Sequence, residues 1–201
     1  MNTELDRTPE ALYFKMSLLT IGFLVLIVIA LVIIGMYNGL VRSKVRVKEA
    51  WSDIDIQLKR RYDLIPNLVN TVKGSTNFES QTLEKVIAAR SAGMAAKTPA
   101  EMSQADQTMR GALNGFFALA ESYPDLKSNQ NFIALQNELS DTENKIQAAR
   151  RFYNSVVTDF NTKLQVFPTN VFGNMLGFKS EEFFELEENE QAARNPVEVK
   201  F

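Results

Sequence analysis

The fold is decided by residues 47–72, which read VKEAWSDIDIQLKRRYDLIPNLVNTV. Apolar side chains recur here every three or four residues, the spacing that places them on one face of an α-helix. Strands would need apolar and polar residues in alternation, and no alternation is sustained. A second such seam follows later in the chain. The first seam comprises Val47, Trp51, Ile54, Leu58, Tyr62, Ile65, Leu68, Val69 and Val72; the second comprises Phe132, Leu135, Leu139, Thr142, Ile146, Ala149, Tyr153, Val156, Phe160, Lys163 and Phe167. Both predict long helices of the bundle or coiled-coil kind.

Helix boundaries follow from caps and prolines. The stretch Thr98-Pro99-Ala100-Glu101 is a capping box with proline at the first helical position, which predicts a helix start. Gly74 can end the first helix in the left-handed conformation, and Pro66 inside that helix predicts a kink. Tyr123-Pro124-Asp125 predicts a turn. The expected helices cover about 37–73, 77–96, 98–122 and 128–167, the last being stopped by Pro168.

These lengths predict an all-α protein, with an N-terminal transmembrane helix followed by an antiparallel up-down four-helix bundle of two long and two short helices. At about 1.5 Å per residue, the long helices span about 55 Å and the short ones about 30–35 Å. The short pair can therefore cover only the distal part of the long pair, which predicts a two-helix stalk opening into a four-helix head. The expected segments are a short extracytoplasmic N-terminus (1–15), a transmembrane helix (16–36), the bundle domain (37–178) and an acidic tail (179–201).

The segment from Met16 to Met36 contains 21 residues and no charge. Such a helix is roughly 31 Å long, about the thickness of a hydrocarbon core. A cleaved signal peptide would have a shorter apolar region, a basic start and small residues at its cleavage site. Here the preceding flank holds three acidic residues, Glu4, Asp6 and Glu10, and two basic ones. The sequence therefore predicts an uncleaved membrane span.

Basic residues predict the orientation of that span. Arg42, Lys44, Arg46 and Lys48 follow it closely, whereas only two basic residues precede it. The positive-inside rule then places the following domain in the cytoplasm and the short N-terminus outside. The same four residues can also contact anionic lipid headgroups, each contributing about 1 kcal/mol near the surface.

Composition removes most catalytic chemistry. The chain has no cysteine and no histidine, which excludes disulfides, thiolate or imidazole metal ligands, cysteine nucleophiles and His-dependent triads. The net charge of −2 gives no general attraction for nucleic acid, and Lys59-Arg60-Arg61 lies among aspartates without stacking aromatics. We therefore predict no catalytic residue, no cofactor, no metal and no nucleic-acid partner.

Three charged residues on the long helices are the best acid–base candidates: Asp63, Glu143 and Arg150. Glu143 and Arg150 are seven residues apart and so share a helix face. One interpretation is a buried general acid or base. The other, which we favour, is a set of charges that neutralise each other or groups on neighbouring helices, as Arg90 would.

Two polar rows on the backs of the long helices form a candidate interface. They are rich in asparagine, a poor helix former whose amide could be compensated by hydrogen bonds to another helix. The alternative is a solvated face that tolerates asparagine. The candidate interface residues are Asp53, Arg60, Asp63, Asn67 and Asn70 in the first row, and Asn144, Arg151, Asn154 and Asn161 in the second.

The segment after Pro168 holds an apolar group that something must cover. Because the last helix returns antiparallel to the first, we expect this group near the bilayer surface. It either packs on the stalk or contacts lipid beside the four basic residues that follow the span. The candidate membrane-proximal residues are Phe172, Met175, Leu176 and Phe178, and the acidic run that follows them (Glu181, Glu182, Glu185, Glu187, Glu188 and Glu190) is expected to be solvated.

Several motifs resemble those of the LemA family. They are Ala50-Trp51-Ser52-Asp53-Ile54, the run from Leu58 to Leu68, Ala89-Arg90, Tyr123-Pro124-Asp125-Leu126, Glu143-Asn144-Lys145-Ile146, Ala149 to Asn154, Phe167-Pro168 and the ending Val197 to Phe201. The resemblance implies a single-pass protein of the bacterial inner membrane with an all-α body and no known catalysis. Genes of this family often neighbour one for a heat-shock-type membrane metalloprotease.

Two functions follow as hypotheses. The first is a non-enzymatic, membrane-anchored scaffold that forms a homo-oligomer, contacts membrane lipid and presents its bundle head to other membrane proteins. The alternative is an adaptor or regulator of a membrane metalloprotease in envelope stress or quality control. An enzyme is a distant third, because histidine and cysteine are absent.

Overall fold

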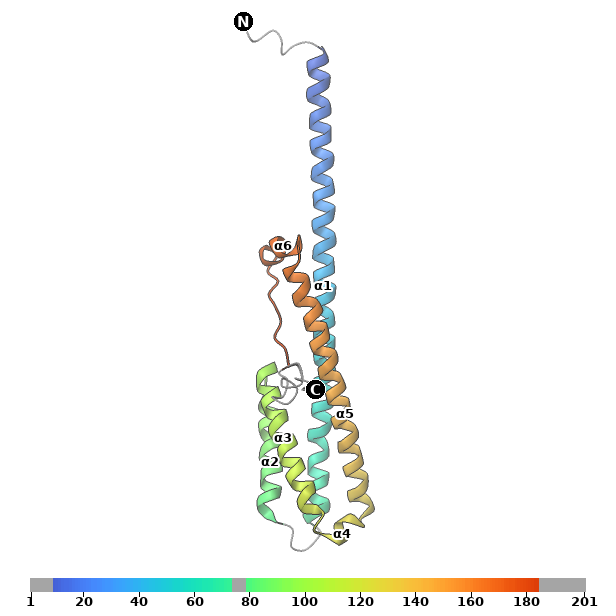
Figure 1. Cartoon of the computed structure of the whole chain (residues 1–201), viewed down its shortest axis with the longest axis vertical. Helices are drawn as coiled ribbons and strands as arrows, with labels where there is room; N and C mark the ends of the chain where they lie inside the picture. Colours follow the sequence, from blue (N-terminus) through green and yellow to red (C-terminus); the bar gives the residue numbers. More distant parts are fainter. Residues whose placement is uncertain (1–8, 74–78, 185–201) are drawn as a thin grey trace, which may run out of the picture. The chain divides into compact units, whose positions relative to one another are not determined.

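In the computed structural model, which describes residues 9–73 and 79–184, the chain is all-helical and these residues form no strand (Figure 1). This confirms the all-α part of the expected fold, whereas the antiparallel four-helix bundle with its two-helix stalk stays a prediction. The helices are α1 (Pro9–Lys73), α2 (Ser80–Ala95), α3 (Pro99–Ala120), α4 (Pro124–Lys127), α5 (Gln130–Gln165) and α6 (Thr169–Met175).

The chain divides into two compact units. The first unit contains residues up to Val45 together with Phe160–Ser180, and the second contains Arg46–Asp159 together with the segment from Glu181 onward. Helices α1 and α5 contribute residues to both units.

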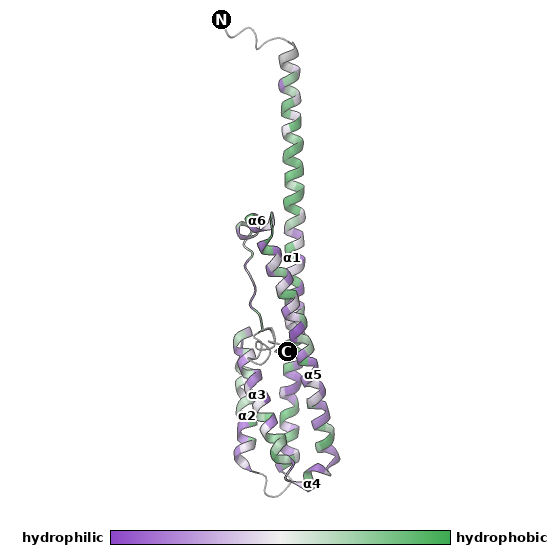
Figure 2. Cartoon of the chain, in the orientation of Figure 1, coloured by the Kyte–Doolittle hydropathy of each residue, from purple (hydrophilic) through white to green (hydrophobic). Residues whose placement is uncertain are grey.

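In the first unit, α1 carries one candidate membrane span, long and apolar enough to cross a bilayer, and the side chains of its most apolar window are not buried. Figure 2 shows this apolar run along the N-terminal part of α1. The helix continues without interruption through Tyr37, as expected, and Pro66 lies inside it. The kink expected at Pro66 stays a prediction.

The capping box at the start of α3 is confirmed. The Glu101 N–H donates to Thr98 Oγ1 at 3.2 Å, and Glu101 Oε2 accepts from the N–H groups of Thr98 (3.2 Å) and Lys97 (2.8 Å). These backbone donors favour the ionised carboxylate and lower the pKa of Glu101. Helix α2 begins at Ser80, and the expected start at residue 77 lies outside the described residues.

The structure contains two short helices that were not expected, α4 and α6. The turn predicted at Tyr123-Pro124-Asp125 is wrong in detail, because Pro124 opens the short helix α4, which buries Leu126. Proline suits this first helical position because its missing N–H has no helical partner there. Helix α6 was not predicted at all. The start of α5 agrees with expectation, since Asn129 Oδ1 accepts the N–H groups of residues 131 and 132.

The two apolar seams supply half of the buried apolar side chains in the described part of the chain. In the first seam every member is buried except Trp51, which is half-buried. In the second seam, burial ends at Phe160, and the prediction is wrong for Phe167, which is 81% exposed. Phe167 follows the end of α5 at Gln165, so the helical repeat that would have placed it on the buried face has already stopped.

Candidate functional site

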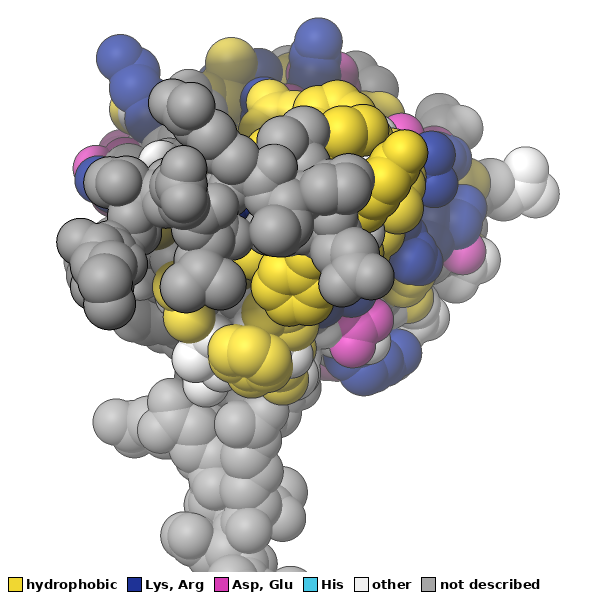
Figure 3. Space-filling model, turned by 90° about the horizontal axis from the view of Figure 1, so that it is seen from above, with side chains coloured by type: hydrophobic (Ala, Val, Ile, Leu, Met, Phe, Trp, Pro, Cys, Tyr) yellow, Lys and Arg dark blue, Asp and Glu magenta, His cyan; other side chains and the backbone are white. Residues whose placement is uncertain are grey.

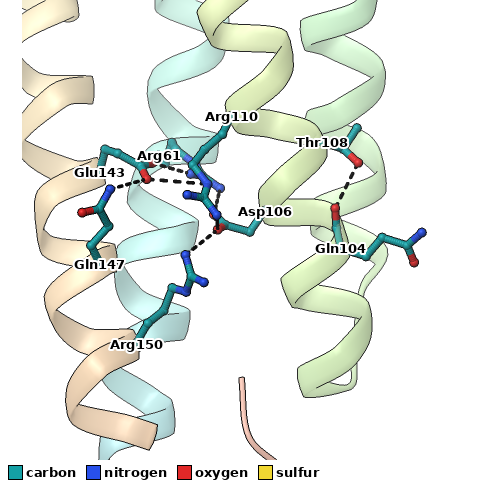
Figure 4. A network of polar contacts seen from close by, with 8 residues as sticks. All are labelled: Arg61, Gln104, Asp106, Thr108, Arg110, Glu143, Gln147 and Arg150. Atoms are coloured by element: carbon teal, nitrogen blue, oxygen red, sulfur yellow. Dashed lines mark hydrogen bonds and ion pairs between the residues drawn. The ribbon is translucent and has the colours of Figure 1, made fainter. Parts of the chain in front are cut away.

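A buried ionic cluster joins α1, α3 and α5 in the second unit (Figure 4). It comprises Arg61, Asp106, Arg110, Glu143 and Arg150. The Arg61 side chain is completely buried, and its Nη2 donates to Asp106 Oδ1 at 2.6 Å while its Nη1 donates to Glu143 Oε2 at 2.9 Å. A single guanidinium on α1 therefore holds carboxylates of two other helices.

The remaining members surround these two carboxylates. Asp106 Oδ2 lies 3.3 Å from Arg110 Nη2 and 3.6 Å from Arg150 Nη1, and Glu143 Oε1 lies 3.7 Å from Arg110 Nε. Gln147 Nε2 donates to the same Glu143 oxygen at 3.4 Å. A buried charge without a counter-charge would be very costly, and here each buried charge faces an opposite one.

The cluster is buried because its members take core positions. Arg61 follows Leu58 by three residues and precedes Ile65 by four, so it continues the apolar seam of α1. Asp106 likewise lies three residues before the buried Met109 on α3. Arg150 lies between the buried Ile146 and Tyr153 on α5. Burial by itself lowers the pKa of Arg61, but attraction to Asp106 and Glu143 and the hydrogen bond to Asp106 outweigh it, so the pKa is raised. Arg61 therefore stays charged at any physiological pH.

The three acid–base candidates are only partly brought together. Glu143 and Arg150 both belong to the cluster, through Arg61 and Asp106, whereas Asp63 is exposed on α1 and takes no part. The sequence analysis did not single out Arg61, because it is part of the basic run at 59–61, and it did not single out Asp106. The spacing of Arg61 from Leu58 and Ile65 is the signal that could have shown that Arg61 is buried. Among the residues that the structure describes, no group of side chains could hold a metal ion.

A groove of about 420 Å³ opens beside the cluster between α3 and α5. Its apolar part is formed by Leu113, Phe117 and Leu139. Its polar lining comes from Arg110, Asn114, Gln136, Ser140, Glu143, Asn144 and Gln147. These amide, hydroxyl and charged groups suit a polar side chain of a partner.

A second site on this unit is the C-terminal strap, residues 181–184, which ends in the completely buried Phe184. The Phe184 ring lies 6.2 Å from the Trp51 ring and 5.0 Å from the Arg150 guanidinium carbon. Asn154 clamps its backbone, because Nδ2 donates to Phe184 O and Oδ1 accepts the Phe184 N–H, both at 2.9 Å. Two residues of α5 therefore recognise the strap through its ring and its peptide groups.

Tyr153 supports the strap one residue before this clamp. Its hydroxyl donates to the carbonyl of Glu182 at 2.8 Å, and its ring meets the Trp51 ring edge-on at 5.3 Å. Burial, with smaller contributions from Glu181 and Glu182, raises the pKa of Tyr153 to about 12. The hydroxyl therefore remains a donor over the whole physiological range.

The strap changes two expectations from the sequence. The boundary at 178/179 between bundle and tail places Phe184 outside the domain, although that side chain is in the core. Within the acidic run, Glu182 is exposed as expected, but Glu181 is partly buried. Glu185, Glu187, Glu188 and Glu190 lie outside the described residues. The Asn154 amide does form hydrogen bonds, as expected for an asparagine inside a helix. Its partner, however, is the backbone of Phe184 in the same chain and not another helix.

Except for Asn161, the other members of the candidate interface lie on the surface. Arg60 pairs with Glu138 on α5 at 2.9 Å, and both side chains are exposed. Asn161 is partly buried in the first unit and so is separate from the other members. The other exposed members are Asp53, Asp63, Asn67, Asn70, Asn144 and Arg151.

The candidate membrane-proximal residues also fall in different places. Arg42 and Lys44 belong to the first unit, whereas Arg46 and Lys48 belong to the second. In the first unit, Phe178 is buried with its ring 5.8 Å from that of Tyr37, and Met175 is 79% exposed. Phe172 is partly buried, and Leu176 is exposed. The apolar group therefore packs on α1 in part and leaves another part uncovered.

These helices and motifs match a known protein family. The profile of the LemA family matches residues 50–201, which include the first seam from Trp51 onward, the whole second seam, the ionic cluster and the strap. The chain belongs to the LemA family. The resemblance noted in the sequence is thereby confirmed.

Individual relatives agree with this assignment. Protein LemA of Metamycoplasma hominis is 31% identical over 187 residues, covering 91% of this chain and 82% of the relative. Magnetosome protein MamQ 2 of Paramagnetospirillum magneticum is 22% identical over 195 residues, covering 84% and 72%. Magnetosome protein MamQ of Magnetospirillum gryphiswaldense is 23% identical over 193 residues, covering 83% and 71%. With the candidate span in α1, these matches indicate a membrane-associated helical protein.

Proposed function

We propose that this LemA-family chain is a non-enzymatic, membrane-anchored scaffold that self-associates and presents a four-helix bundle head to other membrane proteins. One observation carries the proposal. In the described part of the chain the buried charged side chains are Arg61, Asp106 and Arg150, and all three belong to the ionic cluster. Charges used to join α1, α3 and α5 fix the register of helices, which is the best-attested role of buried polar groups in bundles.

The candidate interface on α1 supports self-association. Asp63, Asn67 and Asn70 expose polar groups along one face of the helix, and Ile56 in the same row is 55% exposed. A C2 dimer can use such a row twice, because each copy offers both donors and acceptors to the other. The membrane placement belongs to the same proposal: a single span in the bacterial inner membrane, with the short N-terminus outside and the bundle in the cytoplasm.

The experiment is the mass of the full chain after extraction in a mild detergent, measured by size exclusion with light scattering. We expect one homogeneous homo-oligomer. Asn67→Ala with Asn70→Ala should lower that mass although alanine improves helix propensity. The matched control is Gln81→Ala on α2, an exposed amide outside the row, which should leave the mass unchanged. A monomeric wild-type chain would contradict the scaffold.

The groove between α3 and α5 favours a second candidate function, an adaptor for a membrane metalloprotease. Its apolar floor at Leu113 and Leu139 and its polar rim could receive a side chain of such a partner. The same extraction separates the two functions, because an adaptor would emerge as a monomer together with the protease. Leu113 is buried, so Asn114→Asp, an exposed groove residue outside the candidate interface, is the better test of partner loss.

A further inference from the structure

Helix α6 and the turn before it leave an apolar ridge uncovered in the first unit. The ridge comprises Phe167, Val171, Met175 and Leu176, all exposed, with Phe167 at 81% and Met175 at 79%. Figure 3 shows the molecule from above, with hydrophobic side chains on the visible face. A ridge of large apolar side chains on a short helix is a typical sign of a binding surface.

The ridge is held firmly against the part of α1 that follows the span. Below it, Phe178 packs its ring on Tyr37 at 5.8 Å. Gly173 fits so closely that a Cβ there would lie 3.0 Å from Leu164 Cδ2 and 4.0 Å from Leu40 Cδ1. These contacts fix one side of α6 on α1 and α5 and point the remaining apolar side chains outward.

The contacts on α1 set the depth of the ridge. Tyr37 directly follows the uncharged segment 16–36, and Leu40 comes three residues later. At about 1.5 Å per residue, both lie within about 6 Å of the end of the span along the helix axis. The headgroup region on each side of a bilayer is of the order of 5–8 Å deep. When the span crosses a bilayer, α6 therefore lies at the level of the headgroups.

The charge of the surrounding chain identifies the lipid. Residues 37–45 and 160–180 contain Arg42, Lys44, Lys163 and Lys179 and no Asp or Glu, in a chain whose net charge is −2. Lys163 Nζ donates to Ser43 Oγ at 2.7 Å, so one of these cations also joins α5 to α1. Cations beside an apolar ridge match the boundary between anionic headgroups and acyl chains.

We propose that α6 is a second membrane contact of this protein, an interfacial wedge. Its apolar ridge enters the upper acyl region of the leaflet on the C-terminal side of the span, and the four cations bind anionic headgroups. The proposal rests on the membrane anchorage proposed above. It adds a site at which the protein can sense lipid charge, separate from the span itself.

The absence of cysteine in the wild-type chain allows a direct test with single introduced cysteines. The full chain carrying Met175→Cys is spin-labelled and reconstituted at one chain per nanodisc, in phosphatidylcholine with one quarter phosphatidylglycerol. Collision rates with oxygen and with a water-soluble nickel chelate then report lipid or water around the label. Met94→Cys on α2, a methionine that is 59% exposed in the second unit, is the matched control, and Val25→Cys reports the span.

We expect Val25→Cys and Met175→Cys to favour oxygen several-fold over Met94→Cys, and Met175→Cys to lose part of that preference in discs of phosphatidylcholine alone. If Val25→Cys reports lipid while Met175→Cys matches Met94→Cys, the wedge is overturned and the anchor stands. If Val25→Cys reports water, the anchor itself fails. Shielding of Met175→Cys that appears only in discs with two chains would assign the ridge to a second copy, and would also overturn the wedge. If the label at Met175→Cys lies equally deep in both lipid mixtures, the proposed binding of the four cations to anionic headgroups is overturned.

Discussion

Arg90 on α2 donates its Nε–H to the backbone carbonyl of Tyr62 on α1 at 2.8 Å. In a regular helix that carbonyl would accept the N–H of the residue four positions later, which here is Pro66 and has none. A side chain from a second helix therefore replaces the hydrogen bond that proline removes. The same contact ties α2 to α1.

This replacement predicts a strong coupling between Arg90 and Pro66. Arg90→Met should lower the free energy of unfolding by about 1–3 kcal/mol, because the Tyr62 carbonyl is left without a partner. In a Pro66→Ala background the cost should be smaller, since the new N–H at position 66 can bond that carbonyl. Urea unfolding of the full chain in detergent, followed by the fluorescence of the single tryptophan, Trp51, measures both. Equal costs in the two backgrounds would contradict the assignment.

Tyr62 also explains a glycine on the facing helix. A Cβ at Gly93 would lie 2.3 Å from Tyr62 Oη and 2.5 Å from Cζ, and the Tyr62 ring is buried. Gly93→Ala should therefore destabilise the second unit by about 1–3 kcal/mol through overpacking. Gly111→Ala on α3 is the control, because nothing lies within 4 Å of its Cβ position and the change should stabilise by up to about 1 kcal/mol. Urea unfolding followed by Trp51 fluorescence measures both changes. A Gly93→Ala variant that is more stable than the wild type would contradict the close packing of Gly93 against Tyr62.

The ionic cluster predicts asymmetric mutational costs. Asp106→Ala leaves Arg61 without its closest counter-charge and should cost about 3–5 kcal/mol. Arg61→Met combined with Asp106→Leu should cost less than the sum of the single changes, because no charge is then stranded. Lys145→Ala breaks an exposed pair with Asp141 at 2.7 Å and should cost less than about 1 kcal/mol. Additive costs for the pair would mean that the two charges are not coupled.

Much of the fold could be predicted because helical periodicity is a local signal. The seams, the capping box and the candidate membrane span all depend on residues close together in the chain; the capping box is found as expected, the second seam is buried as far as Phe160, and α1 carries one candidate span. The buried cluster could have been inferred from the same periodicity, since Arg61 interrupts an otherwise apolar seam at a core position. The partners of Arg61 could not be inferred in this way, because Asp106 and Glu143 belong to other helices.

The packing of the strap could not be predicted from helical periodicity either, for a different reason. Residues 181–184 belong to no helix and carry no periodic pattern, so nothing local shows that Phe184 is buried. Its partners, Trp51 and Asn154, lie far away in the sequence. The exposure of Phe167 has the opposite cause, since the local pattern continued past the point where α5 ends.

The strap predicts a change in stability at alkaline pH. Tyr153 has its pKa raised to about 12 in the folded chain, against about 10 in the unfolded chain. A raised pKa means that the folded state holds the proton more tightly, so the stabilisation is complete below pH 10 and is lost as the pH rises towards 12. Tyr153→Phe removes the hydroxyl that donates to the Glu182 carbonyl and should cost about 1 kcal/mol at neutral pH. Unfolding of both proteins between pH 7 and 12, followed through Trp51, isolates this group from the lysines and other tyrosines that the two share. The difference in unfolding free energy should be constant up to about pH 9 and then shrink, and a difference that stayed constant to pH 12 would show that the Tyr153 hydroxyl does not hold the strap.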